Sequence, residues 1–124
     1  MKIAVFSSKS YDRQSLEHYN AAFDHELTFF EPRLSPETVA LARGFPGVCI
    51  FVNDQCDAAV IADLARHGTK IIATRSAGYN QIDLSAAAQH HLLAARVPAY
   101  SPNAVSEFTV ALMLTLGRKI HKAY

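Results

Sequence analysis

The sequence contains little glycine, and the spacing of its glycines excludes the common nucleotide-binding loops. Its 124 residues include five glycines, no two of which are separated by a single residue. A GxGxxG turn, which holds a pyrophosphate against a helix N-terminus, is therefore absent. The Walker loop and the metal-binding HExxH pattern are absent as well. We therefore expect this chain alone to bind neither a dinucleotide nor a metal.

Cysteine, net charge and long apolar runs are also scarce. Cys49 and Cys56 lack CxxC spacing, which favours a reduced, cytoplasmic protein. Twelve basic and eleven acidic residues give a formal charge of +1, so neither nucleic acid nor an anionic membrane is an expected partner. No apolar run reaches the roughly 20 residues that span a bilayer. The apolar run near the start is too short for a signal peptide and is typical of a first strand.

The sequence does show a regular alternation of short apolar runs and helix-like segments. The runs with strand composition are 2–6, 26–30, 48–52, 70–74 and 92–97. The run at 48–52 is continuous, as in a strand covered on both faces. This alternation predicts one α/β domain with a parallel sheet, helices on both faces and right-handed crossovers. The most economical arrangement is flavodoxin-like, with strand order 2-1-3-4-5.

Capping residues mark the ends of two expected helices. Ser35 and Pro36 suit the first turn of a helix that Gly44 closes in a left-handed turn. Asp57 suits the N-cap of the next helix, which Gly68 ends. Further helices are expected over 12–23, 83–91 and 103–121.

The expected last helix is apolar around most of its circumference. One stripe contains Val105, Phe108, Leu112, Leu116 and Ile120, and the other side contains Val110, Ala111, Met113 and Leu114. A helix that is apolar all round is normally buried on all sides, whereas a five-stranded domain covers one side only. We therefore expect the rest to be covered by protein outside this chain. In the isolated chain we expect the helix to form a homodimer or larger assembly, or to fold back over its own sheet.

Ligands of such sheets bind beyond the carboxyl ends of the strands, near the point where the strand order reverses. This rule selects residues 7–8, 51–53, 75–80 and 98–101. Within 75–80, Gly78 permits a positive φ, and two successive N–H groups there suit a carboxylate; an ordinary turn explains the same residues. Tyr100 either donates to a ligand or packs over its loop. Phe51 belongs either to the hydrophobic core or to the wall of a ligand pocket.

Three blocks of sequence together carry a family resemblance. They are GVCIFVND at 47–54, KIIATRSAGYNQIDL at 70–84 and RVPAYSPNAVSEFTVALMLTLGRKIHKAY at 96–124. The chain resembles the N-terminal part of the D-2-hydroxyacid dehydrogenase family, and within it the fermentative, NAD-dependent D-lactate dehydrogenases. The resemblance implies a flavodoxin-like substrate-side (catalytic) domain at 1–101 and an inter-domain linking helix at 102–124. It also implies that the Rossmann domain carrying NAD lies outside this chain.

The resemblance further implies a reaction and a role for individual residues. In the parent enzyme, hydride passes reversibly from NADH to a small 2-keto acid, with pyruvate giving D-lactate. The backbone at Ala77 and Gly78 would hold the substrate carboxylate, Tyr100 would face the substrate, and Phe51 would lie near its methyl end. Val105 would lie near the nicotinamide. The family's catalytic Arg, Glu and His fall outside this chain, which is therefore expected to contain no catalytic residue and to be inactive alone.

Two positions depart from the family pattern, and other functions compete with it. Many relatives carry Glu-His at Glu107-Phe108, and relatives usually turn on a glycine within 89–91, which is Gln-His-His here. A parent enzyme acting on a longer 2-keto acid is one alternative. A phosphoacceptor receiver domain needs acidic residues after the first strand, and a flavin module needs a glycine there. The sequence at 7–10 is Ser-Ser-Lys-Ser, which has neither feature. The alternative of another class is a non-enzymatic receiver-like or interaction domain.

Overall fold

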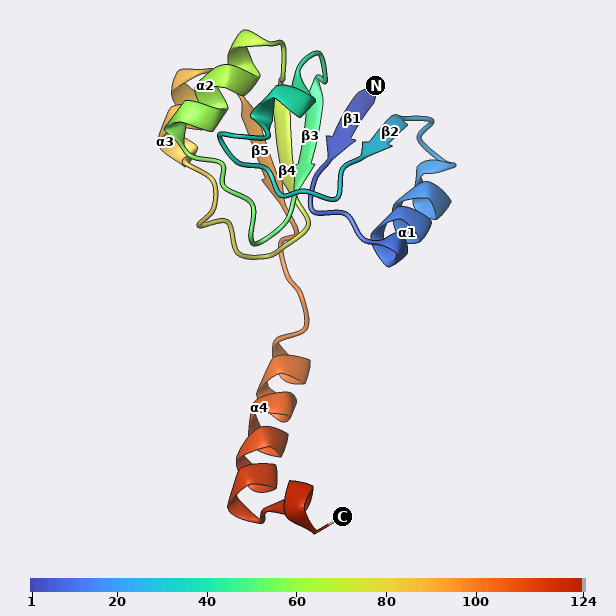
Figure 1. Ribbon diagram of the computed structural model, residues 1–124, viewed down its shortest axis with the longest axis vertical. Helices are drawn as coiled ribbons and strands as arrows, with labels where there is room; N and C mark the ends of the chain where they lie inside the picture. Colours follow the sequence, from blue (N-terminus) through green and yellow to red (C-terminus); the bar gives the residue numbers. More distant parts are fainter. Residues whose placement is uncertain (124) are drawn as a thin grey trace.

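A computed structural model describes residues 1–123 and contains one five-stranded sheet, all of whose strands are parallel (Figure 1). The strands are β1 (Lys2–Val5), β2 (Glu26–Phe29), β3 (Gly47–Ile50), β4 (Ile71–Thr74) and β5 (Leu93–Arg96). Their order in the sheet is β2-β1-β3-β4-β5. The flavodoxin-like order predicted from the sequence is thus confirmed.

Residues 1–123 contain four helices, three of which lie on the faces of this sheet. They are α1 (Ser10–Asn20), α2 (Ala58–Arg66), α3 (Leu84–Gln89) and α4 (Pro102–Gly117), with 3-10 turns η1 (Val39–Ala42) and η2 (Ile120–Lys122). Helix α1 lies on one face, and α2 and α3 lie on the other (Figure 1). From β1 the chain moves outward to β2, and from β3 it moves in the opposite direction to β5. Right-handed crossovers then place the connecting helices on opposite faces.

The capping residues predicted from the sequence are only partly correct. The Asp57 carboxylate accepts the N–H groups of Ala59 and Val60, each at 3.0 Å, so it is the N-cap of α2. Gly44 and Gly68 have φ of 80° and 94°, as predicted.

The helix expected after Ser35 is only the 3-10 turn η1. The carbonyl of Ser35 accepts N–H groups from both Thr38 and Val39, and the Thr38 hydroxyl donates to the Arg33 carbonyl. These local bonds close a tight turn before a regular helix can begin.

Helix α3 ends on a histidine in an unusual conformation. Asp83 caps its start by accepting the N–H of Ala86 at 2.9 Å. Beyond its end, His91 has φ of 56°, in the left-handed region that favours glycine. This is the segment where the sequence departs from the family's glycine. The helix therefore still ends in this segment, with a histidine in the left-handed conformation in place of a glycine.

The core lies mainly between the sheet and the helices α2 and α3. Its fully buried side chains include Phe6, Leu34, Val48, Ile50, Val60, Ile61, Leu64 and Ile72. Each buried aliphatic or aromatic side chain stabilises the fold by about 1.5–3 kcal/mol.

The opposite face of the sheet is less completely covered. Cys49 in β3 and Ala73 in β4 are only half-buried, and Tyr19 in α1 and Phe23 shortly after it are exposed. A hollow of about 280 Å³ lies between α1 and these strands. The expectation that the run at 48–52 is covered on both faces is therefore wrong for the α1 side, because α1 lies toward β1 and β2.

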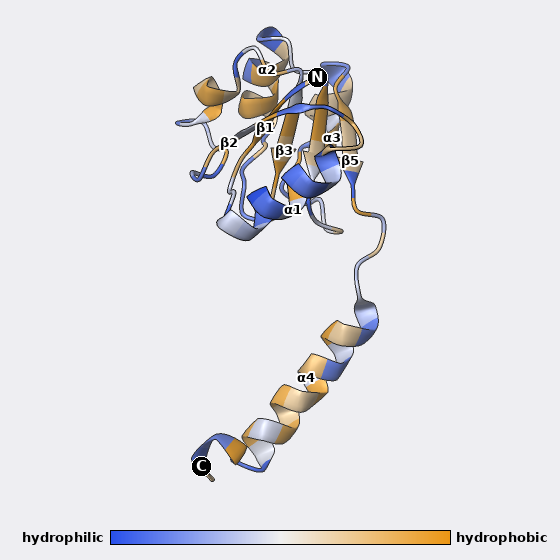
Figure 2. Ribbon diagram, turned by 90° about the vertical axis from the view of Figure 1, so that its right-hand side faces the viewer, coloured by the Kyte–Doolittle hydropathy of each residue, from blue (hydrophilic) through white to orange (hydrophobic). Residues whose placement is uncertain are grey.

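Helix α4 leaves the body of the molecule and extends away from the carboxyl edge of the sheet (Figures 1 and 2). None of its residues is buried, and Figure 2 shows apolar residues along most of its length. It ends at Gly117, four residues before the predicted end. Tyr124, the last residue of the expected linking segment, lies outside the described residues. Among residues 1–123, no helix is long and apolar enough to cross a membrane.

Candidate functional site

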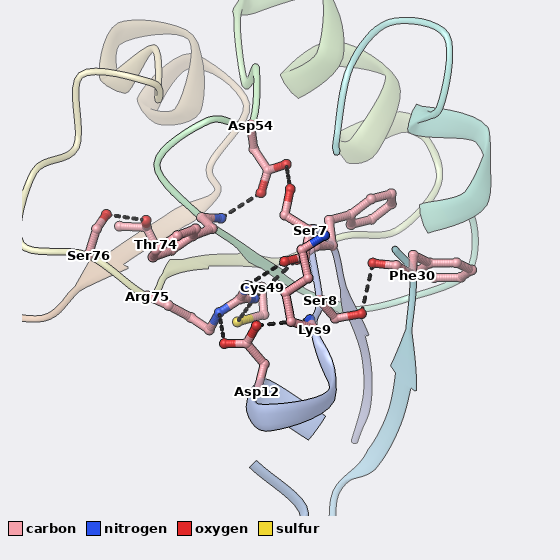
Figure 3. A network of polar contacts seen from close by, with 12 residues as sticks. Ser7, Ser8, Lys9, Asp12, Phe30, Cys49, Asp54, Thr74, Arg75 and Ser76 are labelled. Atoms are coloured by element: carbon pink, nitrogen blue, oxygen red, sulfur yellow. Dashed lines mark hydrogen bonds and ion pairs between the residues drawn. The ribbon is translucent and has the colours of Figure 1, made fainter. Parts of the chain in front are cut away.

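Asp54 connects three segments at the carboxyl edge of the sheet (Figure 3). It follows β3, and the residue is only 3% exposed. One carboxylate oxygen accepts the Ser7 hydroxyl and the Leu34 N–H, both at 2.7 Å, and the other accepts the Phe51 N–H. Because a buried carboxylate without donors is costly, these three bonds stabilise the site and fix the loop after β3.

Arg75 forms a second network at the same edge, directly after β4 (Figure 3). Its guanidinium donates to the carbonyls of Phe6 at 3.1 Å and Ser7 at 3.2 Å. Its Nε lies 3.7 Å from a carboxylate oxygen of Asp12. The guanidinium carbon lies 5.3 Å from the centre of the Phe51 ring, within the range of a cation–π contact. Arg75 therefore ties the ends of β1 and β4 to the residue that follows β3.

The turn at 76–78 is held by side-chain hydrogen bonds. Gly78 does not adopt the positive φ that a glycine permits. The Ser76 hydroxyl donates to the Gly78 carbonyl at 2.7 Å, and Arg96 donates to the Ala77 carbonyl at 3.0 Å. These two bonds hold the turn without a left-handed residue. Within residues 1–123, the N–H groups of Ala77 and Gly78 donate to no other group. Two successive N–H groups thus stay available to an anion.

Arg96 joins this turn to the loop that follows β5. Besides the Ala77 carbonyl, it donates to the carbonyls of Val97 at 3.4 Å and Pro98 at 3.3 Å. Its guanidinium also lies 5.4 Å from the centre of the Tyr79 ring. The loop therefore leaves the sheet next to the turn at 76–78.

The structure brings together some of the predicted site residues and leaves others apart. Phe51 lies beside the Arg75 side chain, and Arg75 comes shortly before Ala77 and Gly78 in the same turn. Tyr100 is 79% exposed on the segment that leads to α4, and Val105 is 58% exposed on α4 itself. In the described part of the chain, no hydrogen bond joins the Tyr100 side chain to Phe51 or to the turn.

The two cysteines are not activated thiols. Burial raises the pKa of Cys56 to about 12. Burial also raises the pKa of Cys49, although the nearby Arg75 opposes this shift. Because the thiolate is the reactive form, neither residue suits a nucleophile at neutral pH. Residues 1–123 contain no group of three or more His, Cys, Asp or Glu side chains placed to hold a metal ion.

The turn after β1 does not fit a dinucleotide. In such a site, free N–H groups at the following helix N-terminus face a pyrophosphate. Here the Asp12 carboxylate already accepts the Lys9 N–H at 2.9 Å. The hydroxyls of Ser7 and Ser8 are bonded to Asp54 and to the Phe30 carbonyl. The Lys9 N–H and both serine hydroxyls therefore already have partners, and the Asp12 carboxylate adds a negative charge to the first turn of α1.

Asp54, Asp12 and Arg96 organise this edge, and the sequence reasoning assigned none of them a role in the site. Asp54 and Arg96 did carry a signal, since each stands within a few residues of the carboxyl end of an apolar run. In a parallel sheet that position lies at the ligand-binding edge. Asp12 carried a weaker signal, as an acid in the first turn of a helix.

Comparison with known proteins finds a matching family and related sequences. Residues 3–121 match the model of the D-isomer specific 2-hydroxyacid dehydrogenase, catalytic domain. The chain is 48% identical to D-lactate dehydrogenase of Escherichia coli (strain K12), covering 100% of this chain and 38% of that protein. It is 51% identical to a 2-hydroxyacid dehydrogenase homolog of Haemophilus influenzae, again covering 100% of this chain and 38% of the relative. The chain thus spans little more than a third of these relatives.

Solved structures agree with the fold. The apo-structure of D-lactate dehydrogenase from Escherichia coli superposes with a TM-score of 0.88, covering 100% of this chain and 39% of that chain at 48% identity. A D-isomer specific 2-hydroxyacid dehydrogenase from Lactobacillus delbrueckii ssp. bulgaricus, solved in its NAD complexed form, gives a TM-score of 0.74 at 30% identity. That match covers 98% of this chain and 37% of the other.

Proposed function

Because this chain belongs to the D-isomer specific 2-hydroxyacid dehydrogenase family, we propose that it is the substrate-side domain of an NAD-dependent D-lactate dehydrogenase. The complete enzyme would reduce pyruvate to D-lactate with NADH. Residues 1–101 would form this domain and 102–124 the helix leading to the nucleotide domain. The observation that carries the proposal is the 48% identity to the Escherichia coli D-lactate dehydrogenase over the full chain.

The proposed substrate contacts follow from the carboxyl edge of the sheet. The adjacent N–H groups of Ala77 and Gly78 suit the two oxygens of a small carboxylate. Phe51 supplies an apolar wall for the methyl group. Tyr100 has an exposed phenol that donates to a substrate oxygen once the rest of the enzyme closes over it. These assignments are supported by the order of the strands and by the availability of the two N–H groups.

NAD belongs, in this proposal, to the part of the enzyme that this chain does not cover. In the turn after β1, Asp12 accepts the Lys9 N–H and the serine hydroxyls are bonded within the protein, and the sequence has no GxGxxG. The catalytic Arg, Glu and His would lie in that remaining part. Val105, on α4, is the one residue of this chain proposed to lie near the nicotinamide. The chain alone would be inactive.

The proposed setting is the cytoplasm, and the proposed partner of the isolated chain is a second copy. Both cysteines are free thiols, which suits a reducing compartment. Helix α4 does not fold back over its sheet, and its apolar side chains are exposed. A two-fold pair is the commonest closed way to cover such a surface.

The test is a stereospecific assay of the full-length protein. Pyruvate, 2-ketobutyrate and 2-ketoisocaproate are each supplied with NADH, and the product is resolved by chiral chromatography. We expect D-lactate from pyruvate with the highest kcat/KM of the three. A higher kcat/KM for a longer acid would mean that the protein is a related 2-hydroxyacid dehydrogenase and not a D-lactate dehydrogenase. Formation of L-lactate, or no oxidation of NADH with any of the acids, would refute the proposal.

A further inference from the structure

We propose that Arg75 is a positioning residue that fixes the Phe51 ring and thereby sets the chain-length selectivity for the 2-keto acid. The inference rests on the proposed function, in which Phe51 borders the methyl end of the substrate. It assigns Arg75 no contact with the substrate. The residue acts through the ring that it holds.

The contacts of Arg75 hold its guanidinium beside the Phe51 ring, and we call this arrangement of Arg75 and Phe51 the clamp. Its side chain is only 14% exposed, and it donates to two consecutive carbonyls, those of Phe6 and Ser7. With both ends of the guanidinium fixed in this way, its plane cannot move away from the Phe51 ring, whose centre is 5.3 Å away. A planar fork that bonds at two points and stacks on an aromatic ring is specific to arginine.

Asp54 holds the same phenylalanine from its backbone side. Its carboxylate accepts the Phe51 N–H, so the main chain is fixed where the ring begins. The other oxygen accepts the Ser7 hydroxyl, while the Ser7 carbonyl accepts from Arg75. Ser7 therefore lies between the two charged groups, and its φ of 51° is in the left-handed region. Such a conformation persists only where its surroundings impose it.

The consequence for selectivity is steric. A ring with one face against a fixed guanidinium and with a fixed backbone has few rotamers available. Without Arg75 the ring can turn toward the space that the guanidinium occupied, and the pocket then admits a longer side chain. Discrimination of one methylene in an apolar pocket is worth about 10- to 200-fold in kcat/KM, so a loosened wall should remove part of that factor.

The test uses the full-length protein with Arg75→Gln. The measured quantity is the ratio of kcat/KM for pyruvate to that for 2-ketobutyrate. We expect this ratio to fall by about three- to tenfold, a fraction of the discrimination available for one methylene. Arg75→Lys keeps the charge and loses the fork, so its ratio should lie nearer to Arg75→Gln than to wild type. An unchanged ratio in both variants would overturn the proposal.

Arg13 provides a matched control. Its guanidinium lies 4.5 Å from the centre of the Phe29 ring, on an exposed side chain that also pairs with Glu17. Arg13→Gln removes the same kind of contact from the end of β2 and should leave the ratio at its wild-type value. A similar fall in this variant would mean that the ratio reports a general loss of stability, and the proposal would fail.

A double-mutant cycle separates positioning from a direct role of Arg75. If Arg75 acts through the ring, then Arg75→Gln should change the ratio less than twofold once Phe51→Leu is present, since coupled residues are not additive. A full, multiplied effect in the Phe51→Leu background would show that Arg75 acts independently, and this would overturn the proposal. Should Arg75→Gln fail to fold, Arg75→Lys enters the same cycle.

A crystal structure of the Arg75 variant keeps this inference separate from the proposed function. If the wild-type enzyme reduces no 2-keto acid, the proposed function fails, and the position of the Phe51 ring still tests the clamp. We expect the ring to change its χ angles in Arg75→Gln and to stay in place in Arg13→Gln. An unmoved ring in Arg75→Gln would refute the clamp, whatever the activity.

Discussion

At the scale of single residues, Tyr100 offers the simplest test of the proposed substrate contacts. Tyr100→Phe removes the hydroxyl and keeps the ring, which is exposed and packs against little. A hydrogen bond of this kind contributes about 0.5–1.5 kcal/mol, so kcat/KM of the full-length enzyme for pyruvate should fall by roughly two- to tenfold. The melting temperature should stay the same. Steady-state constants equal to those of wild type would remove Tyr100 from the site.

Cys56 gives a prediction about pH. Burial raises the pKa of its thiol from an ordinary value of 9.0 to about 12, so the folded state keeps the proton when the unfolded state has lost it. The thiol's contribution to stability is therefore complete below pH 9 and is lost as the pH rises toward 12. The loss approaches about 1.4 kcal/mol per pH unit in that window.

The measurement is urea unfolding of wild type and Cys56→Ala between pH 8 and pH 11. Other groups titrate in this range in both proteins, so the difference between the two free energies of unfolding isolates the thiol. The free energy of unfolding of wild type should fall relative to that of Cys56→Ala as the pH rises above 9. Parallel pH profiles for the two proteins would contradict the assignment.

Residue-level details were the least predictable from the sequence. The candidate segments around Phe51 and Gly78 lie at the carboxyl edge as predicted, because each follows a strand of a parallel sheet. The sequence left the conformation of Gly78 open, and the bonds from Ser76 and Arg96 hold the turn without a positive φ. The role of Asp54 depends on partners 47 and 20 residues away, a separation that no local pattern shows.

At the scale of elements, the start of α2 depends on Asp57. Hydrogen bonds from Val60, Gln55 and Ala59 lower the pKa of its carboxyl group from 3.8. Asp57→Ala should reduce the free energy of unfolding by about 1 kcal/mol near neutral pH, a typical value for a lost N-cap. Because the folded pKa is lowered, this contribution is present above about pH 4 and is lost as the pH falls through the folded value.

Asp57→Asn is the matched control for this prediction. Its amide oxygen still accepts from the backbone and does not titrate, so this variant should be close to wild type in stability without the same loss in acid. Denaturant unfolding at pH 7 and at pH 3 measures both effects. A difference between wild type and Asp57→Ala that stayed constant across this range would contradict the charged cap.

The elements themselves were largely predictable, for a physical reason. Each strand is a short apolar run between polar turns, and this pattern survives in the sequence whatever the tertiary contacts. The exceptions are short segments whose side chains compete with the backbone, as Thr38 does before η1. The partial cover over Cys49 was also missed, because the sequence does not reveal where α1 lies across the sheet.

At the scale of the whole molecule, α4 should drive association of the isolated chain. It exposes several large apolar side chains, including Val110 and Leu114. Covering each fully is worth about 1.5–3 kcal/mol before entropic losses. Sedimentation should show a dimer or a larger species. Leu114→Glu should shift the chain toward monomer, while Thr109→Glu adds the same charge at a polar position and should shift it less. A clean monomer at high concentration, with α4 helical, would contradict this expectation.

We propose that this chain supplies the substrate side of a D-2-hydroxyacid dehydrogenase and not its nucleotide site. Titration calorimetry of NADH into the isolated chain and into the full-length protein tests it directly. In the turn after β1, the Lys9 N–H and the hydroxyls of Ser7 and Ser8 are bonded within the protein, and the sequence has no GxGxxG. We expect the full-length protein to bind NADH and the isolated, folded chain to give no binding heat. Micromolar binding of NADH to the isolated chain would refute this assignment.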